Sequence, residues 1–152
     1  MVSDSHGDEF ALRRAIAAQP EAKLIFHLGD GAAEALKVAD ELPERNLRVV
    51  SGNRDWGSIM PETGLETAGG RLIFYTHGHR YDAKSGLYRL ICAAMERRAV
   101  ILLFGHTHIP LTDYDDGLYI LNPGSLANRK PTYGIIDITP AGIVTNIVEM
   151  RS

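Results

Sequence analysis

Aspartate, asparagine and histidine residues follow five short apolar runs of this sequence. The set comprises Asp4, His6, Asp30, Asn53, His77, His106 and His108. Carboxylate and imidazole ligands suit Mn²⁺, Zn²⁺, Fe and related ions, and no thiolate is needed. Seven such ligands are too many for one tetrahedral ion. They suit two ions about 3.5–4 Å apart that share a bridging group, so the pattern predicts a site for two metal ions.

The spacing of these residues favours the same conclusion. Asp4 and His6 are separated by one position, and so are His106 and His108. Alternate residues of an extended segment point to the same side, so both members of a pair can reach one site. Glycine directly precedes three of the candidate ligands and allows tight turns and close approach of the backbone. These three are Asp30, Asn53 and His106.

The elements that position these residues alternate in the first half of the chain. Apolar runs at 23–27 and 47–51 predict buried strands, and helical spacing predicts helices over 8–18 and 32–42. In the second helix Leu36, Ala39 and Leu42 recur on one face, which we expect to face the core. This alternation predicts an α/β domain with largely parallel pairing, in which ligands bind beyond the carboxyl ends of strands.

The second half of the sequence has more antiparallel character. Hairpins are predicted around Gly69-Gly70 and Asp115-Asp116-Gly117. A helix is predicted over 85–98, with Ser85 as its N-cap and Met95 among its inward residues. Strands are predicted at 100–104, 133–138 and 143–149. A parallel half and a more antiparallel half favour two mixed β-sheets packed face to face, with helices outside.

The start of the chain leaves little room for a first strand. Only three residues precede Asp4, whereas strands usually run about 5 or 6 residues. Either the first strand is unusually short or the chain is truncated at its start. Otherwise we expect residues 1–152 to form a single domain, because no linker or repeat divides them.

Composition bounds the function class. Of the 152 residues 45% are apolar, and the net charge of −3 does not favour a surface built for nucleic acid. Cys92 is the single cysteine, so no intrachain disulfide can form. No apolar run approaches the roughly 20 residues needed to span a bilayer, and no leader pattern opens the chain. We therefore expect a cytoplasmic protein that does not associate with membranes.

The ordered motifs resemble those of the calcineurin-like metallophosphoesterases. That family carries D-x-H, G-D, G-N, a lone H and G-H-x-H in this order, and the chain shows D-S-H, G-D, G-N, T-H-G-H and G-H-T-H. The segments T-H-G-H and N-P-G-S resemble the small YfcE-like phosphodiesterase branch of bacteria and archaea. The resemblance implies a four-layer α/β/β/α sandwich and a hydrolase acting on phosphoric ester bonds.

The resemblance also implies a role for each candidate ligand. Asp4, His6 and His108 would hold one metal, Asn53, His77 and His106 the other, and Asp30 would bridge both. A hydroxide bridging the ions would attack phosphorus in line. The family implies Mn²⁺, with Zn²⁺, Fe or Ni²⁺ as alternatives that the ligands accept.

One position departs from the larger family. Many relatives have a histidine after the G-N asparagine that protonates the leaving oxygen, and this chain has Arg54. A guanidinium stays charged and serves as a phosphate clamp, not as an acid. His79 is the alternative proton donor, with plain surface exposure as the competing interpretation. We therefore assign Asn53, Arg54 and His79 as candidate catalytic residues and expect good leaving groups, such as aryl phosphodiesters, to be favoured.

Other residues near the motifs have a simpler interpretation. His27 lies inside a predicted strand, so we expect a buried, hydrogen-bonded histidine and not a ligand. Trp56 is expected to cap the core, and Cys92 to be a small core residue. The segment 122–125 is expected to be a supporting turn.

The sequence leaves three functions open. The first is a phosphodiesterase or phosphomonoesterase that acts on small substrates. The second is a protein-interaction scaffold of the same fold, as in a retromer subunit whose metal site has degenerated. The third is a nuclease, which the acidic balance disfavours. All seven ligands are present, which favours catalysis; the physiological substrate and oligomeric state are not specified by the sequence.

Overall fold

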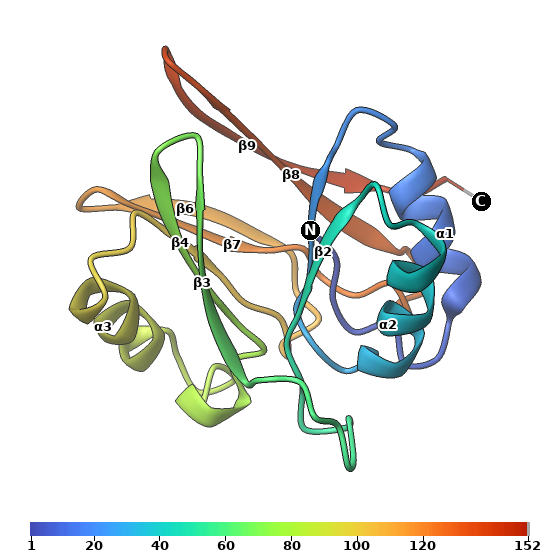
Figure 1. The fold of residues 1–152 in the computed structure, drawn as a ribbon. Helices are drawn as coiled ribbons and strands as arrows, with labels where there is room; N and C mark the ends of the chain where they lie inside the picture. Colours follow the sequence, from blue (N-terminus) through green and yellow to red (C-terminus); the bar gives the residue numbers. More distant parts are fainter. Residues whose placement is uncertain (152) are drawn as a thin grey trace.

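Two layers of β-structure lie between helices in the computed structural model, which describes residues 1–151 (Figure 1). The helical elements of these residues are α1 (Glu9–Ala17), α2 (Ala32–Glu41), α3 (Tyr88–Glu96) and the 3₁₀ turn η1 (His79–Tyr81). The strands are β1 (Leu24–His27), β2 (Asn46–Val49), β3 (Thr63–Ala68), β4 (Arg71–Thr76), β5 (Ile101–Leu103), β6 (Leu111–Asp115), β7 (Leu118–Asn122), β8 (Thr132–Thr139) and β9 (Gly142–Glu149). None of these helices is long and apolar enough to cross a membrane.

The first β-layer is assembled around the start of the chain. β1 pairs with β2 in parallel, and β8 pairs with β9 in antiparallel fashion. Val2 forms a parallel bridge with His27 of β1, and Met1 exchanges two backbone hydrogen bonds of 2.8 and 2.9 Å with Gly134 of β8. The short N-terminal segment therefore joins the two strand pairs and leads directly to Asp4.

The second β-layer is a mixed sheet of five strands in the order β3-β4-β5-β7-β6. Its centre, β4-β5-β7, is parallel, and both edges are antiparallel hairpins. Gly69-Gly70 and Asp116-Gly117 form the two-residue turns, and all four residues have positive φ, as hairpin turns of this length require. Both predicted hairpins are confirmed, but the second half of the chain contains more parallel pairing than the sequence indicated.

Alternation along the central strands builds the four layers. Phe26 of β1 and Leu103 of β5 belong to one apolar cluster, to which both sheets contribute. Ile25, next to Phe26, packs instead with residues of α1 and α2, while Leu102, next to Leu103, packs with α3. Strands covered on both faces read as continuous apolar runs, which explains why they were recognised in the sequence. The predicted α/β/β/α sandwich is confirmed.

Four details of the sequence prediction were wrong. Leu36 is 37% exposed, because α2 turns the smaller residues Ala32, Ala35 and Val38 to the core. Ser85 does not cap a helix: Gly86 has φ of 150°, α3 begins at Tyr88, and the Ser85 hydroxyl donates to Asp82. Met95, on α3, is 56% exposed. Trp56 is 86% exposed, in a turn together with Gly57, and does not reach the core.

Candidate metal centre

The carboxyl ends of strands from both β-layers deliver the predicted ligands to one edge of the molecule. Asp30 follows β1 and Asn53 follows β2 in the first layer, with Asp4 at the end of the N-terminal segment. His77 follows β4, and the pair at 106 and 108 follows β5 in the second layer. The site is thus shared between the two sheets.

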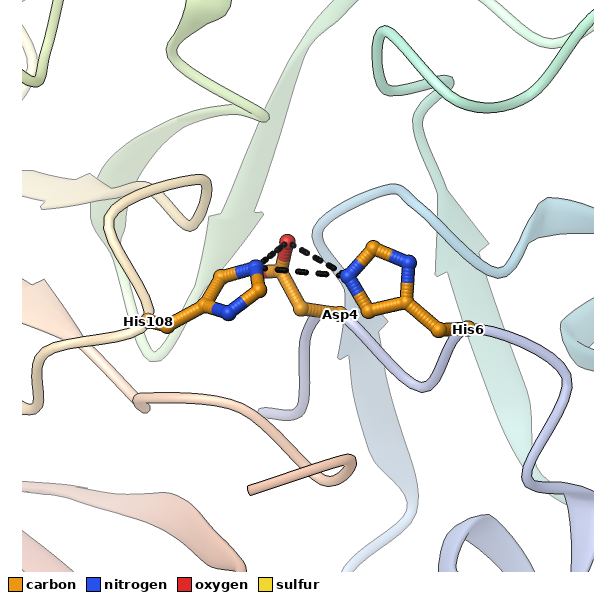
Figure 2. Close-up of side chains that lie close together, drawn as sticks. All are labelled: Asp4, His6 and His108. Atoms are coloured by element: carbon orange, nitrogen blue, oxygen red, sulfur yellow. Dashed lines mark hydrogen bonds and ion pairs between the residues drawn. The ribbon is translucent and has the colours of Figure 1, made fainter.

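Asp4, His6 and His108 form one tight group (Figure 2). Asp4 Oδ1 lies 3.0 Å from Nε2 of His108 and 3.7 Å from Nε2 of His6. The two Nε2 atoms are 3.3 Å apart. One carboxylate oxygen and two imidazole nitrogens therefore converge on a single point, as ligands of one ion would.

Asp4, Asp30 and His77 form a second tight group. His77 Nε2 lies 3.5 Å from Asp30 Oδ2, 4.0 Å from Asp4 Oδ1 and 3.1 Å from Oδ1 of Asn53. The other ring nitrogen, Nδ1, is 2.7 Å from the Leu28 carbonyl oxygen. An N–H donated there leaves Nε2 free as a ligand, the arrangement usual for metal-bound histidine.

Asp4, Asp30 and His77 are ionisable and buried next to one another, which shifts the pKa of Asp30 and that of His77. Burial alone would raise the pKa of Asp30, but the hydrogen bond and charge of His77 and the Arg54 N–H lower it to about 2. Burial opposes protonation of His77, yet the carboxylates of Asp30 and Asp4 raise its pKa. The two carboxylates thus stabilise a positive charge beside them. A bound cation would supply this charge in place of the proton on His77.

His106 lies beside these groups and belongs to neither. Its ring centroid is 5.0 Å from that of His77, and its backbone N–H donates to Asp4 Oδ2 at 3.1 Å. Burial, together with the nearby His77, lowers the pKa of His106 to about 4. A neutral imidazole at this position is in the form that binds metals.

The fit of a cation to this site rests on one oxygen atom. Asp4 is completely buried, and its Oδ1 has no hydrogen-bond partner. An unpaired carboxylate oxygen in the interior costs several kcal/mol unless a cation compensates it. Imidazole Nε2 atoms of three histidines surround it within 4.0 Å. The donor set of carboxylate oxygens and imidazoles therefore fits divalent transition metals.

The backbone conformation at the candidate ligands is also unusual. Five of the seven candidate ligands have φ between 47° and 67°, in the left-handed region, namely Asp4, His6, Asp30, His106 and His108. Asp and His belong to the few non-glycine residue types enriched there. Residues in this region carry strain that persists where the surrounding structure enforces it, often at functional sites.

The two candidate catalytic residues outside the metal set lie at the margin of the site. Arg54 has an exposed side chain, and its backbone N–H donates to Asp30 Oδ1 at 2.7 Å. The ring of His79 is 5.4 Å from that of His77, and its Nε2 is 3.7 Å from Glu62 Oε1. Burial, followed by His77, lowers the pKa of His79, while Glu62 acts in the opposite direction.

A family model matches this fold and this set of residues. The model of the calcineurin-like phosphoesterase superfamily domain matches residues 1–140. The chain belongs to this superfamily. Among curated proteins, the probable metallophosphoesterase YsnB of Bacillus subtilis is 35% identical over 144 residues, covering 91% of this chain and 82% of YsnB. The phosphodiesterase YfcE of Escherichia coli is 28% identical over 169 residues, covering 89% and 84% of the two chains.

The chain is also similar to proteins with other names. Vacuolar protein sorting-associated protein 29 of Schizosaccharomyces pombe is 32% identical over 105 residues, covering 67% of this chain and 56% of that protein. Among solved structures, a conserved uncharacterized protein of Streptococcus pneumoniae, described as a predicted phosphoesterase, superposes with a TM-score of 0.76 at 27% identity. It covers 98% of this chain and 95% of the other.

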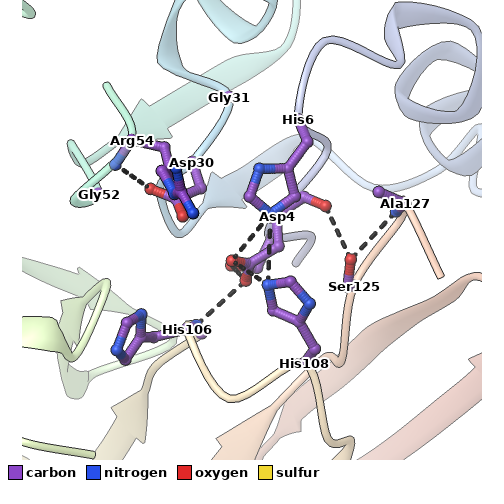
Figure 3. A network of polar contacts seen from close by, with 12 residues as sticks. Asp4, His6, Asp30, Gly31, Gly52, Arg54, His106, His108, Ser125 and Ala127 are labelled. Atoms are coloured by element: carbon purple, nitrogen blue, oxygen red, sulfur yellow. Dashed lines mark hydrogen bonds and ion pairs between the residues drawn. The ribbon is translucent and has the colours of Figure 1, made fainter. Parts of the chain in front are cut away.

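Several residues outside the ligand set support this site. Ser3 donates to Asp4 Oδ2 at 2.5 Å, and Asp55 binds the loops at Asp30 and Asn53. Ser125 donates to the Asp4 carbonyl oxygen at 2.8 Å and accepts from the Ala127 N–H, as Figure 3 shows. The N-P-G-S segment is thus the expected supporting turn; nothing in the sequence indicated Ser3.

His27 is buried and hydrogen-bonded, as expected. Its Nδ1 accepts from the Gly29 N–H at 3.3 Å, so Nε2 carries the proton and donates to Ser5 Oγ at 2.9 Å. Ser5 in turn donates to Glu34 Oε1 at 2.6 Å, and Glu34 also accepts the Gly7 N–H at 2.7 Å. These hydrogen bonds hold the D-S-H loop against β1, through His27, and against α2, through Glu34.

Proposed function

We propose that this calcineurin-like phosphoesterase is a metal-dependent phosphodiesterase that acts on small phosphate esters. The observation that carries the proposal is the buried Oδ1 of Asp4, which has no hydrogen-bond partner and is faced by the Nε2 atoms of three histidines. The phosphodiesterase activity in the name of the E. coli relative supports the substrate class. A pure scaffold has no need to retain such a costly arrangement.

Two divalent cations complete the proposed site, and we propose Mn²⁺ as the metal. We assign Asp4, His6 and His108 to one, Asn53, His77 and His106 to the other, and Asp30 to both. The membership of Asp4 in both tight groups supports two adjacent positions. Such a pair lowers the pKa of a water nucleophile and stabilises the charge of the attacked phosphate.

Arg54 and His79, at the margin of the site, would bind the substrate and protonate the leaving group. The exposed guanidinium of Arg54, held beside Asp30 through its backbone N–H, would bind a phosphate oxygen of the substrate. His79 would pass a proton to the leaving oxygen. The lowered pKa of His79 makes its protonated form scarcer than that of an ordinary histidine at the same pH. We therefore expect aryl phosphodiesters, whose leaving groups need no proton, to react faster than alkyl ones.

The test is hydrolysis of bis-p-nitrophenyl phosphate and p-nitrophenyl phosphate by metal-stripped protein before and after addition of Mn²⁺. We expect turnover of the diester that depends on metal and falls at least about 100-fold in Asp30→Asn, as loss of a metal-site charge implies. The Asp137→Asn variant, which removes one exposed carboxylate on β8, is the matched control and should keep the activity.

The scaffold function is the alternative that the test separates. The sequence relationship to a vacuolar sorting protein favours this second candidate. A folded protein that hydrolyses neither ester with Mn²⁺, Zn²⁺, Fe²⁺ or Ni²⁺ would point to the scaffold. Hydrolysis of single-stranded or double-stranded DNA or RNA in preference to the small esters would point to the nuclease.

A further inference from the structure

The carboxylate of Asp55, outside the ligand set, accepts four backbone N–H groups. Oδ2 accepts from Asp30 at 2.8 Å and from Gly52 at 2.7 Å. Oδ1 accepts from Gly31 and Ala32, both at 2.9 Å. A carboxylate offers about four lone-pair sites, so all of its acceptor capacity is used within the protein. Hydrogen bonds from N–H groups to a charged acceptor are the strong ones.

These four bonds connect two loops that carry proposed ligands. Asp30 lies between β1 and α2, and Gly52 directly precedes Asn53 after β2. Gly31 occupies the N-cap of α2 and has no side chain to accept the free N–H groups of the first turn. Asp55 supplies that acceptor from the neighbouring loop, and its negative charge complements the positive end of the helix.

A further hydrogen bond joins the same two loops, with the Asp30 carboxylate as the acceptor. Oδ1 of Asp30 accepts the N–H of Arg54, the residue next to Asp55, at 2.7 Å. Each loop therefore binds the other through an aspartate: Asp55 holds the backbone of Asp30, and Asp30 holds the backbone of Arg54. The Asp30 carboxylate is therefore held by this pair of loops on its Oδ1 side, while its Oδ2 faces His77 Nε2 at 3.5 Å.

The other side of the site is held differently. The group of Asp4, His6 and His108 donates no hydrogen bond to the Asp55 carboxylate. Asp4 is bound instead by the hydroxyls of Ser3 and Ser125. Asp55 thus supports one side of the site directly, and the N–H groups of Asp4 and His6 connect the other side to it through the Gly29 and Asp30 carbonyl oxygens at 3.0 and 2.9 Å.

We propose that Asp55 is a positioning residue for the half of the site formed by Asp30, Asn53 and His77. The proposal rests on the proposed function to the extent that this half holds a metal ion. Loss of the carboxylate should release the two loops from each other and disturb the half formed by Asp4, His6 and His108 less. Because Asp30 is assigned to both ions, metal affinity should fall in both halves, but more in the half of Asn53 and His77.

The variant Asp55→Asn tests the proposal. Its amide oxygen accepts two N–H groups, but its NH₂ faces the other two, so half of the bonds are lost. Calorimetric titration of metal-free protein with MnCl₂ should show one site weakened about 10–100-fold and the other weakened clearly less. Amide NMR of the metal-free protein should show the largest shifts at residues 30, 31, 32 and 52. A general loss of stability produces neither asymmetry.

Controls separate the possible failures. Asp137→Asn removes an exposed carboxylate of β8 and should leave both affinities unchanged. If Asp55→Asn does not fold, Asp55→Ser, whose hydroxyl caps helices, undergoes the same titration. Equal weakening of both sites, no weakening, or no Mn²⁺ binding by the unsubstituted chain would overturn the proposal. Asymmetric weakening in a protein that hydrolyses no phosphate ester would instead uphold it and refute the proposed function.

Discussion

At the scale of single residues, chemistry and backbone conformation agree at the site. The ligand types needed for transition metals, Asp and His, also tolerate the left-handed region in which five of them lie. A β-branched or bulky residue there would be strained as well as chemically inert. These positions therefore favour Asp and His both for metal binding and for backbone conformation. Glycine would also suit the backbone, but it has no side chain that could bind a metal.

His27 gives a prediction at this scale, on the pH dependence of stability. Burial lowers its folded-state pKa from 6.5 to about 4. The unfolded chain therefore binds the extra proton first, and stability that is full above pH 6.5 is lost as the pH falls towards 4. The lost free energy of unfolding is about 3 kcal/mol. Urea denaturation in EDTA, at several pH values from 7.5 to 4, measures it.

The variant His27→Gln is the control for that measurement. Its amide keeps a hydrogen-bonding group beside Ser5 but does not titrate. The difference in free energy of unfolding between the unsubstituted chain and the variant should narrow as the pH falls. Only the unsubstituted chain carries an imidazole at this position that is protonated in the unfolded state and neutral in the folded state. A difference that stays constant from pH 7.5 to 4 would show that His27 is not the titrating group.

At the scale of elements, the turns after the strands are packed too closely for any side chain but hydrogen. A Cβ on Gly52 would lie 2.1 Å from Asp30 Oδ1, and one on Gly105 would lie 2.0 Å from Ser3 Oγ and 2.9 Å from Asp4 Oδ2. Neither glycine has positive φ. These two glycines of G-N and G-H-x-H are therefore required by close approach and not by backbone conformation.

Gly105→Ala should displace the carboxylate of Asp4. We expect a loss of about 1–3 kcal/mol in the free energy of unfolding from overpacking, together with weaker Mn²⁺ binding, measured by denaturation and calorimetry. Gly134→Ala is the matched control, because its φ is also not positive and its added Cβ meets the flexible end of Met1. Equal costs in the two variants, with Mn²⁺ binding intact in both, would refute this account of Gly105.

At the scale of the whole molecule, the site lies across the joint between two sheets. Asp30 and Asn53 follow strands of one layer, and His77 and His108 lie beyond strands of the other. An ion bound there would therefore connect the two layers at the edge where carboxylates of one layer meet histidines of the other. Binding to the folded state and not to the unfolded chain must then stabilise the whole fold.

Mn²⁺ should raise the thermal unfolding temperature of the metal-stripped protein. At about 100 times its dissociation constant the ion adds about 2.7 kcal/mol, which is roughly 5–10 °C for a chain of this size. Scanning calorimetry with MnCl₂, and again after EDTA, measures the shift. Asp30→Asn and His77→Ala, one from each layer, should each lose most of it; a shift retained by both would place the binding elsewhere.

Local patterns were enough to find the strands, their polar ends and the order of the ligand motifs. Apolar runs, turn glycines and D-x-H spacing act over a few residues, so they are legible without the fold. Contacts between distant segments were decided by tertiary packing alone. Asp55 acquires its four partners, Asp4 its place in both ligand groups, and Trp56 its exposure, because helices and sheets from separate parts of the chain must first meet. Residue types at strand ends thus determined the chemistry, and the packing of two sheets determined its geometry.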